Sequence, residues 1–188
     1  MDNIYENLVI ISSPSGGGKG TLIGMLMNEV DNIWLSVSAT SRKPRSGERD
    51  GVEYYFLSRA EFKNEIKNDG FLEWAEYSGN FYGTPRKHVE EHLRQGDVVL
   101  LEIEVQGAQN IMKKCEGCHT VFIEPPSLEV LECRLRGRGT ETEEAIQLRL
   151  KTAQEELKEA KFYEKTIVND NLELAFSELK EYIINLAN

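Results

Sequence analysis

Short apolar runs alternate along the chain with stretches in which apolar residues recur every three or four positions. Five runs have the length and β-branched content of buried strands, at residues 8–12, 35–38, 98–103, 120–123 and 166–168. Five stretches have the period of amphipathic helices, at residues 19–29, 86–94, 128–135, 143–161 and 172–186. This alternation predicts an α/β fold in which helices flank a five-stranded, mostly parallel sheet.

Two segments interrupt the alternation. Residues 41–84 are rich in Tyr, Phe, Gly and charge, and a strand-like run at 52–57 precedes a capping box formed by Ser58 and Glu61. We interpret this segment as a small mixed α+β insertion. Residues 134–140 are basic and contain two glycines between two predicted helices. That composition suits a lid that reorients, although an ordinary loop between helices has the same features.

Composition narrows the class of protein. The 188 residues are 40% hydrophobic and 29% charged, as expected for one compact domain with small inserted parts. The net charge of −10 disfavours nucleic acid as a partner, because such binding needs a surplus of positive surface. No apolar run approaches the ~20 residues that span a bilayer, and the N-terminus lacks the pattern of a secretion signal. We therefore expect a cytoplasmic protein with no membrane partner.

The three cysteines raise the question of a metal or haem site. Residues 115–119 read C-E-G-C-H, the pattern of covalent haem attachment, and a zinc site could combine Cys115, Cys118, His119 and Cys133. Haem attachment normally requires export, however, and the spacing to Cys133 matches no common zinc finger. We favour a tight Gly-containing turn before the next strand.

The strongest single motif lies between the first predicted strand and the first predicted helix. Residues 13–21 read S-P-S-G-G-G-K-G-T, the position and composition of a phosphate-binding P-loop. Glycines let backbone N–H groups surround phosphate oxygens, and the helix N-terminus adds a favourable dipole. The ATP-binding residues predicted here are Ser15, Gly16, Gly17, Gly18, Lys19, Gly20 and Thr21. A plain Gly-rich turn between strand and helix is the alternative.

The match to G-x-x-x-x-G-K-[ST] is incomplete at both ends. Ser13 replaces the first glycine, and Gly20 stands where the hydroxyl that binds Mg²⁺ is expected. Thr21 supplies the nearest hydroxyl. We therefore expect Mg²⁺ to be held mainly by nucleotide phosphates and water, with Thr21 as the one candidate protein ligand. Lys19 is expected to meet the β- and γ-phosphates.

Further segments, in order along the chain, resemble one family. Residues 38–48 contain T-S-R-K-P-R-S-G-E, which resembles the T-[ST]-R-x-P-R-x-G-E stretch of guanylate kinases. Other similar segments lie at 71–75, 78–84, 101–107, 137–141 and 168–170. The resemblance runs from about residue 8 to the C-terminus. It implies a P-loop kinase fold and transfer of the γ-phosphoryl group of ATP to GMP, and also to dGMP, giving ADP and the nucleoside diphosphate.

The resemblance also implies a division of the chain. It predicts a nucleotide-binding core at residues 1–37, 86–126 and 158–188. The GMP-binding insertion is predicted at 38–85 and the helical lid at 127–157.

Roles for the acceptor residues follow from the resemblance too. Arg42 and Arg45 are expected to hold the GMP phosphate, a task that suits the guanidinium fork. Tyr54 and Tyr82 would reach the same phosphate. Glu73 is expected to accept hydrogen bonds from N1–H and N2–H₂ of guanine, which adenine does not offer. Further contacts to the GMP nucleotide are expected from Ser38, Thr84 and Glu104.

The remaining roles concern ATP and the transferring group. The family's lid arginines correspond to Arg134, Arg138 and Arg149, although Arg149 lies beside an apolar stripe and its position alone also fits a solvated charge. Asn169, followed by Asp170, is expected in the ATP site. The residues expected to carry catalysis are Lys19, Arg45, Arg138 and Arg149, with Mg²⁺. No general base is required, because an acceptor phosphate with a second pKa of ~6 is already ionised at neutral pH.

Two rival functions remain. A catalytically inactive guanylate-kinase-like domain would bind a phosphorylated peptide, but such domains tend to lose the P-loop lysine and the lid arginines that this chain retains. A kinase for AMP is the second rival, because G-K-G-T at 18–21 also occurs in adenylate kinases. The R-K-P-R segment at 42–45 and Glu73 do not fit that family.

Overall fold

A parallel five-stranded sheet forms the centre of the molecule. The computed structural model describes residues 3–77, 79–137, 139 and 142–186. The sheet has the order β2-β7-β1-β8-β9, and each neighbouring pair is parallel. Its strands are β1 (Leu8–Ser12), β2 (Ile33–Leu35), β7 (Val98–Glu102), β8 (His119–Glu124) and β9 (Lys165–Val168). The predicted α/β fold with a parallel five-stranded sheet is confirmed.

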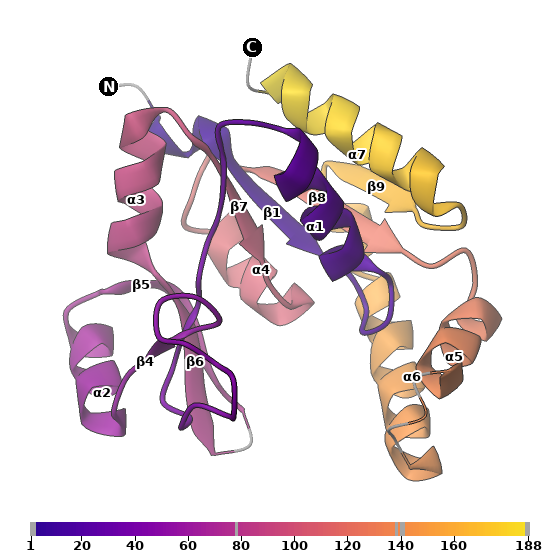
Figure 1. Ribbon diagram of the computed structural model, residues 1–188, viewed down its shortest axis with the longest axis horizontal. Coiled ribbons are helices and arrows are strands. Elements are labelled where there is room, and N and C mark those ends of the chain that lie inside the picture. The colour runs from indigo at the N-terminus through magenta and orange to yellow at the C-terminus, as the bar shows by residue number, and fades with distance from the viewer. Residues whose placement is uncertain (1–2, 78, 138, 140–141, 187–188) are drawn as a thin grey trace.

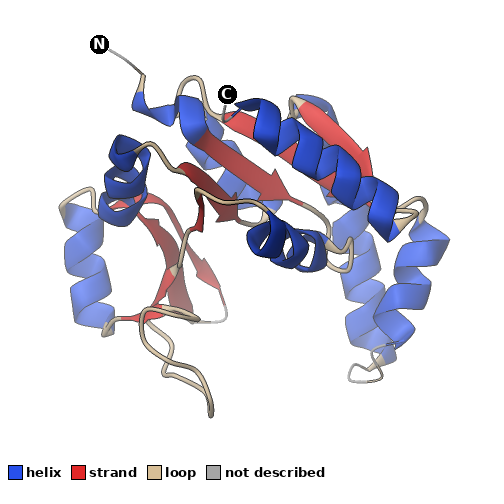
Figure 2. Cartoon of the chain, turned by 45° about the horizontal axis from the view of Figure 1, so that its top comes forward, coloured by secondary structure: helices blue, strands red, loops and turns tan. Residues whose placement is uncertain are grey.

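Helices cover both faces of this sheet (Figures 1 and 2). On one face lie α1 (Lys19–Glu29) and α7 (Leu172–Leu186), which pack on alternate residues of β1 such as Val9 and Ile11. On the other face lie α3 (Arg86–Gln95) and α4 (Val105–Met112), which pack with Leu8 and Ile10. All five residues of β1 are buried, since the strand is central and covered on both sides.

A second, mixed sheet forms the lobe at the left of Figure 1. Its order is β4-β3-β6-β5, with one parallel and two antiparallel pairs. The elements are β3 (Ala39–Thr40), β4 (Tyr55–Phe56), α2 (Arg59–Lys67), β5 (Phe71–Tyr77) and β6 (Asn80–Pro85). The side chains of Phe62, Phe71 and Phe81 form its small core. The predicted capping box at the start of α2 is confirmed: Ser58 and Glu61 each accept a hydrogen bond from the other's backbone N–H.

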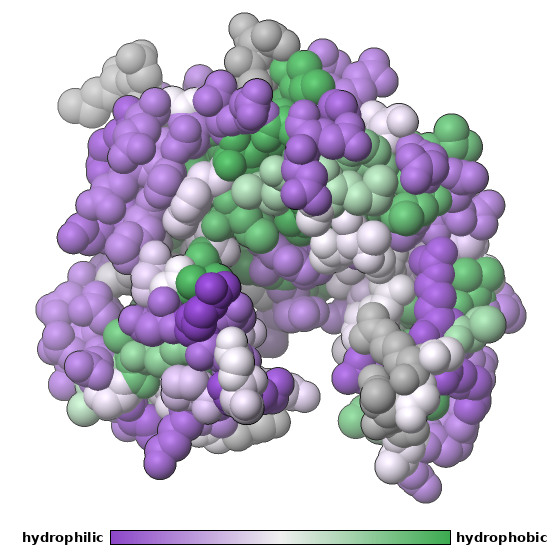
Figure 3. Space-filling view, in the orientation of Figure 1, coloured by the Kyte–Doolittle hydropathy of each residue, from purple (hydrophilic) through white to green (hydrophobic). Residues whose placement is uncertain are grey.

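Two helices form the lobe at the right of Figure 1. The helices α5 (Leu128–Gly137) and α6 (Glu143–Leu157) pack through Leu131, Leu135, Ile146 and Ala153. The space-filling view is deeply hollowed between this helical pair and the second sheet (Figure 3). The carboxyl ends of the central strands lie at the top of this hollow (Figure 1), where ligands of open α/β sheets bind.

Three sequence predictions of local structure need correction. The strand predicted at 35–38 is instead Ile33–Leu35, because these residues pair with Val98–Leu100 before the chain leaves for the second sheet. The helix predicted to reach residue 161 ends at Leu157, and a 3-10 turn, η2 (Ala160–Phe162), follows it. Helix α4 was not predicted, since Gly107 in its middle lowers helix propensity. Another 3-10 turn, η1 (Ile4–Asn7), precedes β1.

Within the part of the chain that the structure describes, no helix is both long enough and apolar enough to cross a membrane.

Candidate active site

The phosphate loop, residues 13–21, joins β1 to α1 in a conformation that requires glycine. Gly16 and Gly18 adopt φ values of +94° and +96°, in the left-handed region that other residues rarely occupy. A Cβ atom at Gly18 would also collide with the side chain of Asn169. The N–H of Gly17 donates to the carbonyl of Pro14 at 2.9 Å, which closes the turn. The loop backbone is therefore fixed before any ligand binds.

A cavity of about 320 Å³ lies against this loop. Lys19 begins α1, and its Nζ donates to the carbonyl of Ile103 at 3.3 Å and lies 3.7 Å from Glu102 Oε1. Thr21 is exposed beside it. The cavity is lined by Ser13, Pro14, Ser15, Gly16, Gly18, Lys19, Gly20, Thr21, Glu102 and Glu104. Every predicted residue of the loop except the buried Gly17 thus faces one space.

The helical pair and the end of β9 meet at the same loop. Arg149 of α6 donates from Nη1 to Ser15 Oγ at 3.0 Å. Arg134 of α5 donates from Nη2 to the carbonyl of Asn169 at 2.7 Å, and Asn169 donates from Nδ2 to the carbonyl of Gly17 at 2.9 Å. The structure therefore brings together Arg134, Arg149 and Asn169 around residues 15–18.

Two further predicted residues are Asp170 and Arg138. Asp170 is exposed just after β9. Arg138 lies outside the residues that the structure describes. Arg134 also has a buried Nη1 that finds no hydrogen-bond partner among the described residues, so this nitrogen can still donate to a ligand.

Glu156 is a residue of this site that the sequence analysis missed. It lies in the last turn of α6, half-buried, and its carboxyl group interacts with Lys19, Glu104 and the backbone N–H of Ser15. Burial, together with the like charge of Glu104, raises the pKa of Glu156 to about 7, against the opposing effects of Lys19 and of that N–H. Its position two helical turns after Arg149, and so on the same face of the helix, is the signal that could have found it.

On the second sheet, arginine and tyrosine side chains gather into a group that we call the acceptor cluster: Arg42, Arg45, Tyr54 and Tyr82. The guanidinium carbon of Arg42 lies 5.4 Å from the centre of the Tyr54 ring, and the Tyr54 and Tyr82 rings are 6.1 Å apart. Arg45 is exposed in the same loop as Arg42. The segments that supply these residues are separated along the chain, and the pairing of β3 with β4 and β6 brings them together.

Glu73 and Thr84 face each other across β5 and β6. Thr84 Oγ1 donates to Glu73 Oε1 at 2.9 Å, and the Glu73 residue is only 9% exposed. Burial raises the pKa of this carboxyl group, while the contacts of Thr84 and the charge of Lys114 oppose the rise. A Cβ atom at Gly107 of α4 would lie 3.2 Å from Glu73 Oε2, so the glycine leaves room beside the carboxylate.

Ser38 and Glu104, the other two predicted acceptor residues, come from different segments of the chain. Ser38 is half-buried just before β3, and its carbonyl accepts from the N–H of Tyr55 at 2.9 Å. Glu104, at the N-terminus of α4, lines the cavity of the phosphate loop. Gly107, whose position leaves room beside the Glu73 carboxylate, belongs to the same helix.

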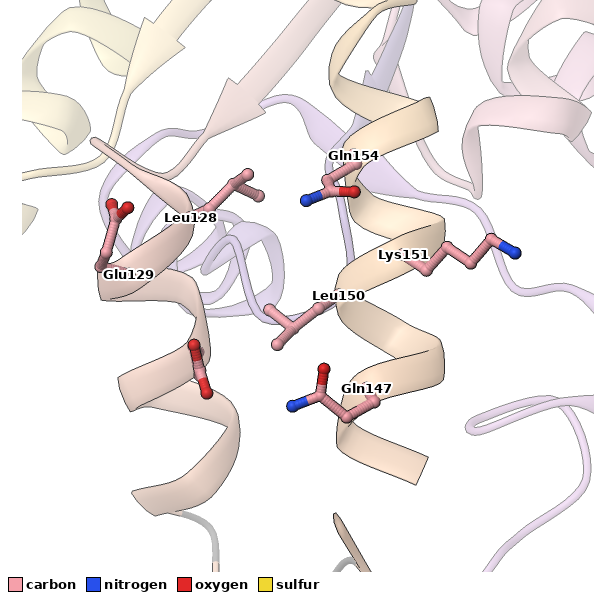
Figure 4. Close-up of a pocket in the computed structure, with 7 residues that line it drawn as sticks. Leu128, Glu129, Gln147, Leu150, Lys151 and Gln154 are labelled. Atoms are coloured by element: carbon pink, nitrogen blue, oxygen red, sulfur yellow. The ribbon is translucent and has the colours of Figure 1, made fainter. Parts of the chain in front are cut away.

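A second cavity, of about 350 Å³, opens between α5 and α6 (Figure 4). It is lined by Leu128, Glu129, Glu132, Gln147, Leu150, Lys151 and Gln154. Two carboxylates and a single lysine do not suit a polyphosphate, so this cavity is not the nucleotide site.

The cysteines form no part of either region. Cys115 is buried, Cys118 is half-buried and Cys133 is exposed, and all three are free thiols. The described residues contain no group of three or more side chains that could hold a metal ion. Gly117 has φ +84° shortly before β8, which confirms the predicted Gly-containing turn.

Known proteins resemble this chain over most of its length. The family model for guanylate kinase matches residues 5–186. The guanylate kinase of Synechococcus sp. (strain CC9311) is 52% identical over 96% of this chain and 95% of its own length. That of Prochlorococcus marinus (strain NATL2A) is 48% identical, over 94% of this chain and 95% of its own.

A solved structure agrees with the sequence matches. The crystal structure of guanylate kinase from Anaplasma phagocytophilum aligns with a TM-score of 0.74 at 36% identity, covering 95% of this chain and 84% of that chain. Since the family model, the relatives and the architecture of the site agree, the chain belongs to the guanylate kinase family.

Proposed function

We propose that this protein transfers the γ-phosphoryl group of ATP to GMP. One observation supports this above the others: a phosphate loop with its lysine borders one side of the hollow, and the acceptor cluster and the buried Glu73 belong to the lobe on the other side. Two regions that suit anions and that face each other can bind two phosphorylated substrates with their phosphate ends together. An inactive peptide-binding domain would need only the acceptor cluster.

The donor is held at the phosphate loop. The loop and the start of α1 line the cavity, where backbone N–H groups at a helix N-terminus suit phosphate oxygens, and Lys19 lines the same cavity. Arg134, Arg149 and Asn169 already contact this loop or one another, so they are placed to surround the nucleotide. We assign Asp170, and Arg138 from its position in the sequence, to the same group.

The acceptor is held on the second sheet. Arg42 and Arg45, with Tyr54 and Tyr82, bind the GMP phosphate through charge-assisted hydrogen bonds. Glu73 and Thr84 read the guanine base, with Ser38 and Glu104 as neighbouring contacts. Because a buried carboxylate would be left unpaired against adenine, the site favours guanine by a factor as large as ~10⁴.

The residues present fit Mg²⁺ delivered with ATP. Thr21, Glu102 and Glu104 line the phosphate-loop cavity, and Mg²⁺ commonly takes one or two protein oxygens with the rest from phosphates and water. Thr21 is the candidate for the protein contact. When bound, the ion neutralises charge on the β- and γ-phosphates.

Catalysis then consists of positioning and charge neutralisation. The acceptor phosphate oxygen is ionised at neutral pH, so this site needs no base to remove a proton from it. Lys19, Arg138 and Arg149 would bind the transferring group, while Arg42 and Arg45 orient the acceptor. Movement of residues 127–157 as a lid and of residues 38–85 toward the core residues would exclude water from the transferring group.

The test measures ADP formation from ATP and Mg²⁺ with GMP, dGMP, AMP, CMP or UMP as acceptor. We expect turnover with GMP and dGMP only. Preference for AMP, or no ADP from folded protein with GMP, would overturn the proposal.

A substitution at Glu73 tests the base assignment directly. In Glu73→Gln the amide offers a donor where guanine also offers donors, so kcat/KM for GMP should fall by roughly 10²-fold to 10³-fold. The matched control is Glu76→Gln, since Glu76 lies on the same strand but is exposed and pairs with Arg59. A variant at Glu73 that keeps wild-type kcat/KM for GMP would show that this carboxylate does not select the base.

A further inference from the structure

Glu48 makes three hydrogen bonds inside the acceptor cluster. Its Oε2 accepts from Arg42 Nη1 at 2.9 Å, its Oε1 accepts from Arg42 Nη2 at 2.9 Å, and its Oε2 also accepts from the backbone N–H of Arg45 at 2.7 Å. The side chains of Arg42 and Glu48 are only 15% and 17% exposed, although residues 43–47 between them are exposed. One carboxylate thus connects both arginines of the cluster, and nothing in the proposed reaction uses it directly.

The pairing fixes which edge of the Arg42 guanidinium faces outward. A guanidinium has five N–H donors in one plane, and a bidentate carboxylate occupies the edge formed by Nη1 and Nη2. The second hydrogen of Nη1 is taken by the carbonyl of Lys43 at 2.8 Å. Nε and the second hydrogen of Nη2 form the remaining edge, and the guanidinium lies over Tyr54, whose ring is next to that of Tyr82. The edge that remains is therefore the one available to a phosphate beside the tyrosines.

The aromatic neighbours restrict the guanidinium further. Its carbon lies 5.4 Å from the centre of the Tyr54 ring and 5.9 Å from that of Phe56, so it packs over two aromatic side chains. Packing over rings limits movement out of the plane, and the bidentate carboxylate limits rotation within it. Arg42 is consequently held in one orientation before a ligand arrives.

The carboxylate remains charged at neutral pH. The hydrogen bonds from Arg42 and from the N–H of Arg45 lower the pKa of Glu48 to about 2. A permanent negative charge next to a phosphate site could act as a competitor for the arginines. The contacts indicate that Glu48 orders the arginines and does not compete for them. It accepts only the backbone N–H of Arg45, and its oxygens leave the outer edge of Arg42 unoccupied.

We propose that Glu48 is a positioning residue for the acceptor nucleotide: its bidentate contact orients the guanidinium of Arg42 toward the phosphate of GMP, and its contact with the N–H of Arg45 fixes the backbone from which the second arginine extends. This inference rests on the proposed function, since it names the residue that orders the acceptor cluster. Glu48 itself does not touch the substrate.

The experiment compares Glu48→Gln with Glu53→Gln. Glu53 lies on the same lobe, accepts from the backbone N–H of Arg49 at 2.6 Å and forms an ion pair with the Arg49 side chain at 3.8 Å, but that side chain is 72% exposed. For each variant, equilibrium binding of GMP and of guanosine, KM for GMP and for ATP, kcat and the melting temperature are measured. Guanosine has the same base and sugar but no phosphate, so it reports only on the base site.

For Glu48→Gln we expect GMP affinity to fall and KM for GMP to rise, each on the order of tenfold, as when a charge-assisted contact is weakened but not removed. Guanosine binding, KM for ATP and the melting temperature should stay near wild-type values. Glu48→Asp, which keeps the charge but is one methylene shorter, should fall between wild type and Glu48→Gln. Glu53→Gln should match the wild type in every measurement.

Three results would overturn this inference. A lower KM for GMP in Glu48→Gln would show that the carboxylate competes with the phosphate. An unchanged KM would show that it plays no part in acceptor binding. Equal weakening of GMP and guanosine with a lower melting temperature would show a merely structural role. Wild-type protein that binds no GMP would instead refute the proposed function, so the two failures are distinguishable.

Discussion

The phosphate loop and the acceptor cluster both suit phosphate groups, but the chain builds them differently. In the proposed function the phosphate loop would take its donors from backbone N–H groups at the end of a fully buried strand. The acceptor cluster would take them from side chains at positions 42, 45, 54 and 82, on a small sheet with a core of a few aromatic residues. A backbone site is rigid and recognisable from one short motif. A side-chain site depends on strand pairing and on contacts such as that between Arg42 and Glu48.

The largest effect should come from removing the cation of the phosphate loop. Lys19→Ala should lower kcat by about 10³-fold, because a charge that stabilises the transferring group is lost from an ordered site. Steady-state kinetics with saturating ATP and GMP would measure the loss. Lys158→Ala is the control, since Lys158 is an exposed lysine paired with Glu155. If Lys19→Ala retains a tenth or more of the wild-type kcat, the lysine does not act on the transferring group.

The next largest effect should separate the two regions. Arg45→Ala should raise KM for GMP by about 10²-fold, since a charged hydrogen bond to phosphate is removed, and should leave ATP binding within about threefold of wild type. Titrations of each nucleotide alone would measure both affinities. Arg49→Ala, in the same exposed loop, serves as the control. Equal losses for ATP and GMP would mean that the two regions are not independent.

A third substitution tests whether ATP binding depends on the backbone conformation of the phosphate loop. Gly18→Ala places a Cβ at φ +96° and against Asn169, so it should weaken ATP binding about tenfold and destabilise the protein by roughly 1–3 kcal/mol. Gly24→Ala on α1 is the control, because an added Cβ there meets nothing within 4 Å and should slightly stabilise the helix. ATP titration and thermal unfolding would check both. If Gly18→Ala binds ATP as the wild type does, the loop conformation does not control donor binding.

The smallest expected effect concerns stability and pH. The pKa of Glu156 is raised to about 7 in the folded protein from an ordinary value of 4.5, so the folded state binds the extra proton between these values. The contribution of this group to stability is therefore full below about pH 4.5 and is lost as pH rises through 7. Glutamine does not titrate, so in the protein without nucleotide the Glu156→Gln variant should not lose this stability as the pH rises through 7.

At pH 8 the Glu156→Gln variant should be more stable than wild type by about 1 kcal/mol, allowing for solvent screening of a half-buried group, and so melt about 2–4 °C higher. At pH 5 the two should melt together. Glu155→Gln is the control, because its side chain is 68% exposed. A difference in melting temperature that does not change between pH 5 and pH 8 would contradict this assignment.

Local patterns predicted most of the elements because their signals are contained within short segments. The strand at 8–12, the helix at 19–29 and the capping box at Ser58 follow from apolar periodicity and hydrogen-bonding residues that are neighbours in sequence. Helix α4 was missed because Gly107 disfavours a helix locally, while packing of Val105, Ala108 and Ile111 on the sheet stabilises it. The strand at 33–35 was predicted a few residues too late, at 35–38, because its pairing with β7, and not its own composition, decides where it ends.

By itself the sequence determined that this protein has a parallel sheet, a glycine-rich loop after its first strand and residue types that suit phosphate and guanine, because those properties depend on composition and spacing along the chain. Only the tertiary structure decided which of these residues meet. It buried Glu73 against Thr84, brought Glu156 to Lys19 and placed Glu48 between the two arginines of the acceptor cluster. The reason is physical: these contacts require strand pairing and helix docking, which join residues that no local pattern connects.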